Sequence, residues 1–419
     1  MFATLRQRNF GLLWTAGLIS LAGDWILMIA LPIYVLQLTG STLATSTLLM
    51  AGMLPDLLFG SIAGVFVDRW DRKRTMVISN LLLAAGLVPL LLVRSADQLW
   101  VLYVVMFFES TIAQFFGPAE NALLPLLVDE QHLVAANSLN ALNNNLARLL
   151  GPAIGGLAAG LVGLAGVAVL DAATFLISAA MIGLIAGSYR ASPAPGTTPE
   201  HFGSAWAKVA REWLAGLRLI RADRVISIMF GLVAIVSLGE GVFAVLFVVF
   251  VNRVLGGGAT EIGWLMSAQA VGGLLGGVLV GWIGHRVAPA RLLGIGGVLF
   301  GLIDLAIFNY PAFLPGFLPA VALFVAVGIP GVVFSAGRST LLQSAVADAY
   351  RGRVFGTYAM AGALMALLGT TLAGTFGDKA GVVTVLNIQG CVYVLAGIIV
   401  PALLGGARRA NVLKLPVRS

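Results

Sequence analysis

Residues 10–38 read FGLLWTAGLISLAGDWILMIALPIYVLQL and carry a single charged side chain, Asp24. A helix needs about 20 largely apolar residues to cross the hydrocarbon core of a bilayer, so this stretch is long enough to span it. The rest of the chain has the same character, because 59% of its 419 residues are hydrophobic and only 10% are charged. Soluble domains carry roughly 25% charged residues, and disordered chains have low hydrophobicity. The sequence therefore predicts a polytopic membrane protein and argues against a soluble enzyme.

Breaking the chain at charges and at clusters of Gly, Pro and Asn gives twelve candidate spans. These apolar runs are too long, and alternate too little, for the strands of a membrane barrel. We therefore expect an all-α membrane protein. The predicted spans are 10–38, 45–67, 75–93, 99–119, 136–160 and 166–189 in the first half, and 225–251, 260–284, 290–310, 316–337, 353–377 and 382–404 in the second.

The basic residues orient these spans. With the N-terminus in the cytoplasm, 21 of the 25 Lys and Arg residues fall in cytoplasmic segments, three fall on the other side and Arg148 lies within a span. Such a positive-inside bias places both termini in the cytoplasm of a multi-pass protein of the cytoplasmic (inner) membrane. The net charge of +7 follows from this topology, so no nucleic-acid partner is expected.

Residues 190–224 form the only sizeable segment outside the predicted spans. After a linker rich in Pro, Ala, Thr and Gly, apolar residues recur at helical spacing between basic ones, which predicts an amphipathic helix on the membrane surface. A simple tether between two halves is the alternative. The predicted organisation is a six-helix half at 1–189, this linker at 190–224, a second six-helix half at 225–404 and a basic tail at 405–419.

The two halves resemble each other in parallel. Gly23-Asp24 matches Gly239-Glu240 at an offset of 216, and further matches occur at offsets of 217 and 218. Parallel six-helix repeats are typical of transporters that bind substrate near the bilayer midplane, at the interface of the repeats. The further matches are Gly60, Gly64 and Arg69 with Gly277, Gly281 and Arg286, and Gly151 and Gly156 with Gly369 and Gly374.

Several motifs carry a family resemblance. Residues 64–74, GVFVDRWDRKR, resemble the loop between helices 2 and 3 of the major facilitator superfamily, with Asp71 in place of a glycine. Residues 147–156, ARLLGPAIGG, resemble the antiporter motif in helix 5 of its exporters. Gly23-Asp24, residues 117–121 and residues 171–175 resemble the branch of macrolide efflux pumps, enterobactin exporters and multidrug proton antiporters. The resemblance covers essentially the whole chain and implies the major facilitator fold, transport by alternating access and no enzyme activity.

The resemblance also implies roles for these motifs. The gating loop would comprise two glycines for close helix packing and an aspartate that accepts N–H groups at a helix N-terminus. Arg72, Lys73 and Arg74 would anchor it on anionic lipid. The antiporter-like motif would let its helix press tightly on its neighbours. The gating residues are Gly60, Gly64, Asp68, Arg69, Arg72 and Lys73, and those of the antiporter-like motif are Arg148, Gly151, Pro152, Gly155 and Gly156.

Ionisable residues inside spans are costly and are functional candidates by default. Asp24 lies about 14 residues into its span, roughly 21 Å deep at 1.5 Å per residue. We expect its carboxyl to take up and release a proton near neutral pH, or else to make a structural hydrogen bond to a neighbouring helix. Glu240 holds the repeat-equivalent place and is predicted to line a central cavity, or to close a gate.

Four further acidic residues lie well inside the predicted spans. Glu109 and Arg148 should lie at similar depth, as a static ion pair or as a proton-linked switch. Asp56 is also near mid-depth, with functional and structural interpretations evenly matched. Asp171 should snorkel to the outer interface, and Asp304 has no explanation in the sequence.

The leading hypothesis is a proton-coupled exporter of hydrophobic or amphiphilic small molecules such as drugs, macrolides or siderophores. A lipid or lysolipid transporter and a proton-linked importer are alternatives, and a transport-inactive receptor or scaffold is a remote one. No GxxxxGK[ST] stretch for ATP and no HExxH occurs, so we expect a proton gradient and no cofactor or metal. The expected partners are the substrate, protons and lipid, with the protein a monomer. The predicted proton-coupling residues are Asp24, Glu240, Glu109 and Asp56, and the predicted cavity residues are Asp24, Trp25, Phe108, Arg148, Glu240, Phe243 and Phe334.

Overall fold

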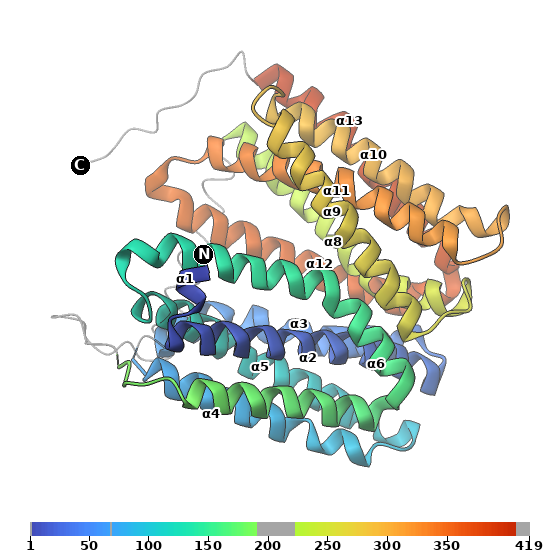
Figure 1. Ribbon diagram of the computed structural model, residues 1–419. Coiled ribbons are helices and arrows are strands. Elements are labelled where there is room, and N and C mark those ends of the chain that lie inside the picture. Colours follow the sequence, from blue (N-terminus) through green and yellow to red (C-terminus); the bar gives the residue numbers. More distant parts are fainter. Residues whose placement is uncertain (1, 68, 191–222, 408–419) are drawn as a thin grey trace. The chain divides into compact units, whose positions relative to one another are not determined.

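The computed structural model describes residues 2–67, 69–190 and 223–407, and every regular element in these ranges is a helix (Figure 1). Eleven of these helices are long and apolar enough to cross a membrane. One of them, α6 (Leu133–Gly183), is broken at Gly163, where φ is 64° and ψ is −174°, a conformation open to glycine. Its two parts coincide with the spans predicted at 136–160 and 166–189. The described helices therefore account for twelve crossings, and the predicted all-α membrane fold is confirmed.

The long helices follow the predicted spans closely. Asp68, the predicted amphipathic helix as far as residue 222 and the tail from residue 408 lie outside the described residues. The first helices are α1 (Phe2–Leu5), α2 (Arg8–Thr39), α3 (Thr42–Val67), α4 (Arg72–Gly86), α5 (Leu99–Leu123) and α6. The later ones are α8 (Arg224–Arg253), α9 (Ala259–Ile283), α10 (Pro289–Asn309), α11 (Leu318–Ala345), α12 (Arg351–Ala380) and α13 (Val382–Ala407).

The chain divides into two compact units. One comprises Met1–Phe202 and Phe247–Ser267, and the other comprises Gly203–Leu246 and Ala268–Ser419. The end of α8 and the start of α9, expected in the second half, belong with the first unit.

Within the first unit, α2 packs along α6. The indole Nε1 of Trp14 donates to the Leu139 carbonyl at 2.8 Å, and the amide of Asn143 donates to the Trp14 carbonyl at 3.0 Å. These bonds satisfy polar groups that water cannot reach inside a helix bundle. They fix the rotation of α6 against α2, and so decide which α6 side chains face α2.

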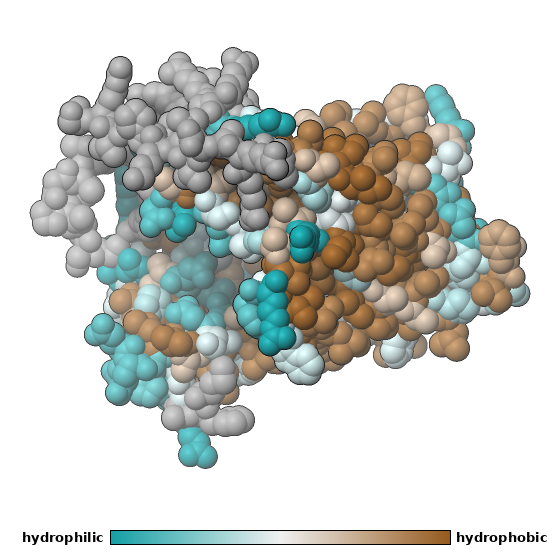
Figure 2. Space-filling model, turned by 90° about the horizontal axis from the view of Figure 1, so that it is seen from above, coloured by the Kyte–Doolittle hydropathy of each residue, from teal (hydrophilic) through white to brown (hydrophobic). Residues whose placement is uncertain are grey.

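Within the second unit, α10 packs between α11 and α13 through glycines. A β-carbon on Gly296 would meet the Phe334 backbone of α11, and one on Gly301 would meet the Gly390 carbonyl of α13. Small residues at such contacts let helices approach closely in the absence of a hydrophobic driving force. The side of α10 away from these contacts is apolar and exposed, as is one side of α13 (Figure 2). The exposed residues there include Ile295, Leu299 and Leu302 on α10 and Ile388, Leu395 and Ile399 on α13.

Candidate functional site

Three acidic side chains gather in the first unit, from three different helices. Asp24 on α2 is exposed although it lies near the middle of a 32-residue helix. Asp171 on α6 is fully buried and packs against Gly23, whose missing side chain leaves room for its carboxyl. Glu109 on α5 is 7% exposed. Both buried acids are close enough to Asp24 to interact with its charge.

The polar atoms of this cluster are incompletely paired. The Thr174 hydroxyl donates to Oδ1 of Asp171 at 3.2 Å, while Oδ2 of Asp171 and Oε1 of Glu109 are buried without a hydrogen-bond partner among the described residues. Like charges repel strongly where water is excluded. A proton or a cation is therefore the species that this arrangement can accommodate, and the protons of such a cluster belong to the group as a whole.

Two predictions about these residues are wrong. Arg148 is exposed, and the structure records no ion pair between it and Glu109 among the described residues. Ala147 and Gly151 occupy the α6 face toward α2, and the next position along a helix points about 100° away. Asp171 does not snorkel, since Gly23 offers it a buried place inside the bundle.

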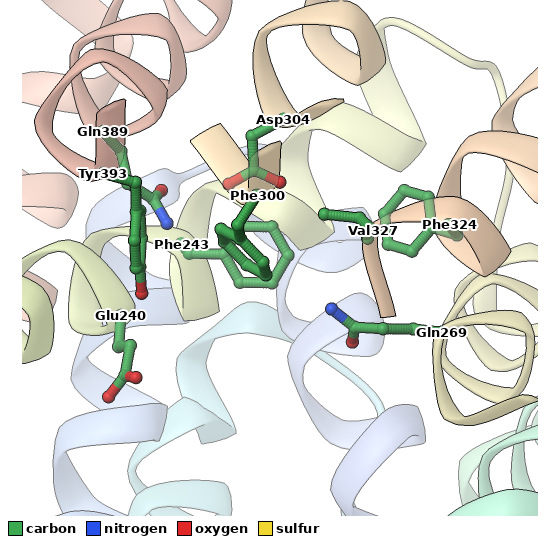
Figure 3. Close-up of a pocket in the computed structure, with 9 residues that line it drawn as sticks. All are labelled: Glu240, Phe243, Gln269, Phe300, Asp304, Phe324, Val327, Gln389 and Tyr393. Carbon is green, nitrogen blue, oxygen red and sulfur yellow. The ribbon is translucent and has the colours of Figure 1, made fainter. Parts of the chain in front are cut away.

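The second unit holds a cavity of about 190 Å³ that is lined by side chains of α8, α9, α10, α11 and α13 (Figure 3). Its carboxyl groups come from Asp304, which is 4% exposed, and from Glu240. Asp304, unexplained by the sequence, thus lies in a polar cavity inside the bundle. The complete lining is Glu240, Phe243, Gln269, Phe300, Asp304, Phe324, Val327, Gln389 and Tyr393.

The cavity and the acidic cluster occupy corresponding places in the internal repeat. Gln389 follows Asp171 by 218 residues, as Gly239 follows Gly23 by 216. The Gln389 side chain lies 3.2 Å from a β-carbon placed on Gly239, just as Asp171 lies against Gly23. The repeat offsets were visible in the sequence, and they would have identified Gln389 had they been extended to the sixth span.

The aromatic residues predicted to line a cavity behave differently from one another. Phe243 does line the cavity of the second unit. Phe334 is only 5% exposed and packs edge-on against Tyr393 at 5.7 Å, so its prediction as a cavity wall is wrong. Glycines on α10 leave it space in the core. Phe108 packs against Gly86, and Trp25 lies over Gly151, so both are partly occupied with helix packing.

The antiporter-like motif brings α6 close to two helices. A β-carbon on Gly155 would meet the backbone of Trp25 and Ile26 in α2, and one on Gly156 would meet the Ala259 carbonyl of α9. From the other side, a β-carbon on Gly263 would overlap the Pro152 carbonyl. Backbones can approach this closely only where side chains are absent.

The loop between α3 and α4 is fastened to the end of the sixth span by Asp71. This carboxylate caps α4 by accepting the Arg74 N–H at 2.9 Å, and it accepts the Ser188 hydroxyl at 2.8 Å and the Tyr189 N–H at 3.1 Å. Partial burial raises the pKa of Asp71, but these hydrogen bonds and the Arg74 charge outweigh it, so that the pKa lies below its ordinary value. The residue that departs from the family's glycine is thus the helix cap.

Arg72 and Lys73, two of the basic residues expected on lipid, also form hydrogen bonds with the end of the sixth span. Lys73 donates to the Ile185 carbonyl at 2.5 Å, and Arg72 donates to the Tyr189 carbonyl at 3.3 Å. Basic side chains commonly satisfy the free carbonyls at helix C-termini. Arg72 and Lys73 thus hold the carbonyl end of the sixth span, whereas Arg74, the third basic residue expected on lipid, is exposed.

The glycines of the gating loop differ in their contacts. A β-carbon on Gly60 would lie 3.1 Å from the Asp56 carboxyl and 3.3 Å from the Gln114 side chain of α5, whereas no described atom lies within 4 Å of a β-carbon on Gly64. Among the described residues, the prediction of close helix packing is therefore wrong for Gly64. Asp56 is exposed on α3 and belongs to neither carboxyl group described above.

The fold and the motifs match a known family. Residues 1–405 match the transmembrane secretion effector family of the major facilitator superfamily. The chain belongs to this superfamily. This major facilitator chain is 26% identical to macrolide efflux protein A of Streptococcus pyogenes over 94% of its own length and 95% of that protein. It is 30% identical to the multidrug efflux pump Tap of Mycolicibacterium fortuitum over 87% and 88% of the two chains.

A solved structure confirms the major facilitator fold. The nucleoside transporter NupG superposes with a TM-score of 0.74, covering 96% of this chain and 99% of that one at 12% identity. At this identity the likeness concerns the fold alone. Together with the family match, it makes the chain a multi-pass membrane transporter of small molecules.

Proposed function

We propose that this transporter is a proton-coupled exporter of hydrophobic or amphiphilic small molecules, working by alternating access in the cytoplasmic membrane with both termini inside. Asp24 carries the proposal, because it is an exposed carboxyl at mid-helix beside two buried acids. The positive-inside bias supports the orientation, and the efflux pumps among its relatives support export.

Coupling follows if the proton and the substrate favour different facing states. A proton on the cluster of Asp24, Glu109 and Asp171 relieves the repulsion among its carboxyls and so favours one state. Substrate favours the other state, in which the cluster gives up its proton. Such a cycle works only if each ligand binds the inward- and outward-facing states with different affinity, so the acids and the moving helices must act together.

Proton release on substrate binding tests this exchange. Purified protein in weakly buffered detergent solution is titrated with ethidium as the cationic probe while a pH dye reports released protons. Wild type is expected to release protons in step with binding, and Asp24→Asn to bind the probe while releasing fewer. Asp97→Asn, which removes an exposed carboxyl outside the cluster, is the matched control and should behave as wild type. If wild type and Asp24→Asn release equal numbers of protons on binding the probe, Asp24 does not take part in the exchange.

A further inference from the structure

The cavity of the second unit contains unsatisfied hydrogen-bond acceptors. In the part of the chain that the structure describes, Oδ2 of Asp304 and Oε1 of Gln389 are buried without a hydrogen-bond partner, on side chains that are 4% and 6% exposed. Both residues line the same cavity. Buried polar atoms are normally hydrogen-bonded, and a carboxylate can only accept. The missing partner is therefore a hydrogen-bond donor.

The walls of this cavity are aromatic. In Figure 3 the Asp304 carboxyl points toward the rings of Phe243 and Phe300, and the Tyr393 ring stands at the side. Aromatic faces attract cations, and organic ammonium groups are recognised by such rings. Rings and a carboxylate together favour an alkyl or aryl ammonium group over a bare metal ion, which prefers oxygen ligands throughout.

The volume limits what can enter. At about 190 Å³ the cavity is smaller than the roughly 300–1,000 Å³ of pockets that enclose a drug-sized ligand. It is large enough for an ammonium group with a short substituent. A whole amphiphile would leave its remaining part outside.

The charged groups near the cavity divide between its two acids. Arg338 on α11 interacts electrostatically with Glu240 and with Tyr393, and its guanidinium lies 6.0 Å from the Phe334 ring. Glu240 lies on the far side of the Phe243 and Phe300 rings from Asp304 (Figure 3). The charge of Glu240 is thus already balanced in part by Arg338, whereas Asp304 is the acid that points toward the Phe243 and Phe300 rings.

We propose that this cavity binds the ammonium end of an amphiphilic amine, with Asp304 as its counter-charge, Gln389 as a second acceptor and Phe243 and Phe300 as its walls. The inference rests on the proposed export function for its role in transport, where it makes lipophilic amines the substrate class. Binding itself needs no gradient and can be measured separately.

Calorimetric titration of the full chain in detergent at pH 7 tests the site, with phenethylammonium as probe and neutral phenethyl alcohol as its match in shape. Wild type is expected to bind the ammonium at least about tenfold more tightly than the alcohol, which corresponds to the loss of one charged contact. Asp304→Asn should abolish that preference, while Asp97→Asn should keep it. Thermal unfolding of each variant shows whether it is folded.

Phe300→Leu gives a second readout if Asp304→Asn does not fold. It keeps an apolar wall but removes the ring, so affinity for the ammonium should fall by at least about threefold while affinity for the alcohol stays within that range. Unchanged ammonium binding in both variants would overturn the proposal. So would binding of Na⁺ that displaces the probe, because the site would then be one for an inorganic cation, or no binding of the probe to wild type.

The same protein variants, tested both for binding in detergent and for transport in proteoliposomes, separate this inference from the proposed function. Ammonium binding that depends on Asp304, without transport driven by a pH gradient, would leave the site standing and contradict the exporter. Gradient-driven transport without such binding would leave the exporter standing and overturn the site.

Discussion

Asp171 packs directly on Gly23, so that any β-carbon at position 23 would overlap the Asp171 carboxyl and the Thr174 hydroxyl. This contact holds a buried acid one residue away from the exposed carboxyl of Asp24. A looser contact occurs at the corresponding place in the second unit, where the Gln389 side chain lies 3.2 Å from a β-carbon placed on Gly239. The glycine before Asp24 is therefore a requirement of packing.

Gly23→Ala should destabilise the protein by about 1–3 kcal/mol, because overfilling a packed helix contact forces side chains or backbone to shift. Gly64→Ala is the control, since no atom of the described residues lies within 4 Å of its new β-carbon, and alanine is the better helix former. Thermal unfolding in detergent measures both. Equal stability of the two variants would show that the contact between Gly23 and Asp171 is not formed.

Asp71→Asn distinguishes the role of Asp71 as the cap of α4 from its hydrogen bonds to Ser188 and Tyr189. Asparagine still caps α4, but it no longer offers both oxygens to Arg74, Ser188 and Tyr189, so a loss of about 0.5–1 kcal/mol is expected at neutral pH. Because folding lowers the pKa of Asp71, its ionised form is favoured in the native state. Its contribution is complete above the ordinary pKa of an aspartate and is lost as the pH falls through the lowered value.

The pH dependence of thermal unfolding checks this assignment. The stability difference between wild type and Asp71→Asn should be constant near neutral pH and shrink below about pH 4. Asp97→Asn should show no such difference. A stability difference between wild type and Asp71→Asn that grows on acidification would contradict stabilisation by the hydrogen bonds of ionised Asp71.

A cysteine pair tests whether the contact between α6 and α9 must open during transport. A β-carbon on Gly160 lies 3.9 Å from that of Thr260, within the range of about 3.5–4.5 Å for a disulfide. With Cys391 replaced by Ser, Gly160→Cys with Thr260→Cys should cross-link on oxidation and stop transport until a reductant is added. The single variants are the controls. Full transport by fully cross-linked protein would exclude this contact from the cycle.

The depth of a residue along its helix was predictable from the sequence, but the direction in which its side chain points from the helix was not. The rise per residue placed Asp24 at mid-helix, and the length of the apolar runs located all twelve spans, including both parts of α6. The partner of Glu109 depended on the rotation of α6, which is fixed by contacts such as that of Asn143 with Trp14. That rotation turns Arg148 away.

Environments built from several helices were also beyond the sequence. The sequence of its own span does not explain Asp304, because side chains from five helices of the second unit surround it. In the sequence Asp71 is only a departure from a family motif. Two of its three hydrogen-bond partners, Ser188 and Tyr189, lie more than a hundred positions away. In both cases the deciding contacts are distant in sequence.

The most direct test of proton coupling is transport by Asp24→Asn in proteoliposomes. Vesicles are loaded so that an imposed pH gradient drives ethidium movement, and binding is measured on the same preparation. The variant is expected to keep binding within about threefold of wild type and to lose gradient-driven transport by at least about tenfold, because the coupled step then lacks the ionisable group that takes up the proton. Gradient-driven transport at the wild-type rate by folded Asp24→Asn would contradict this expectation.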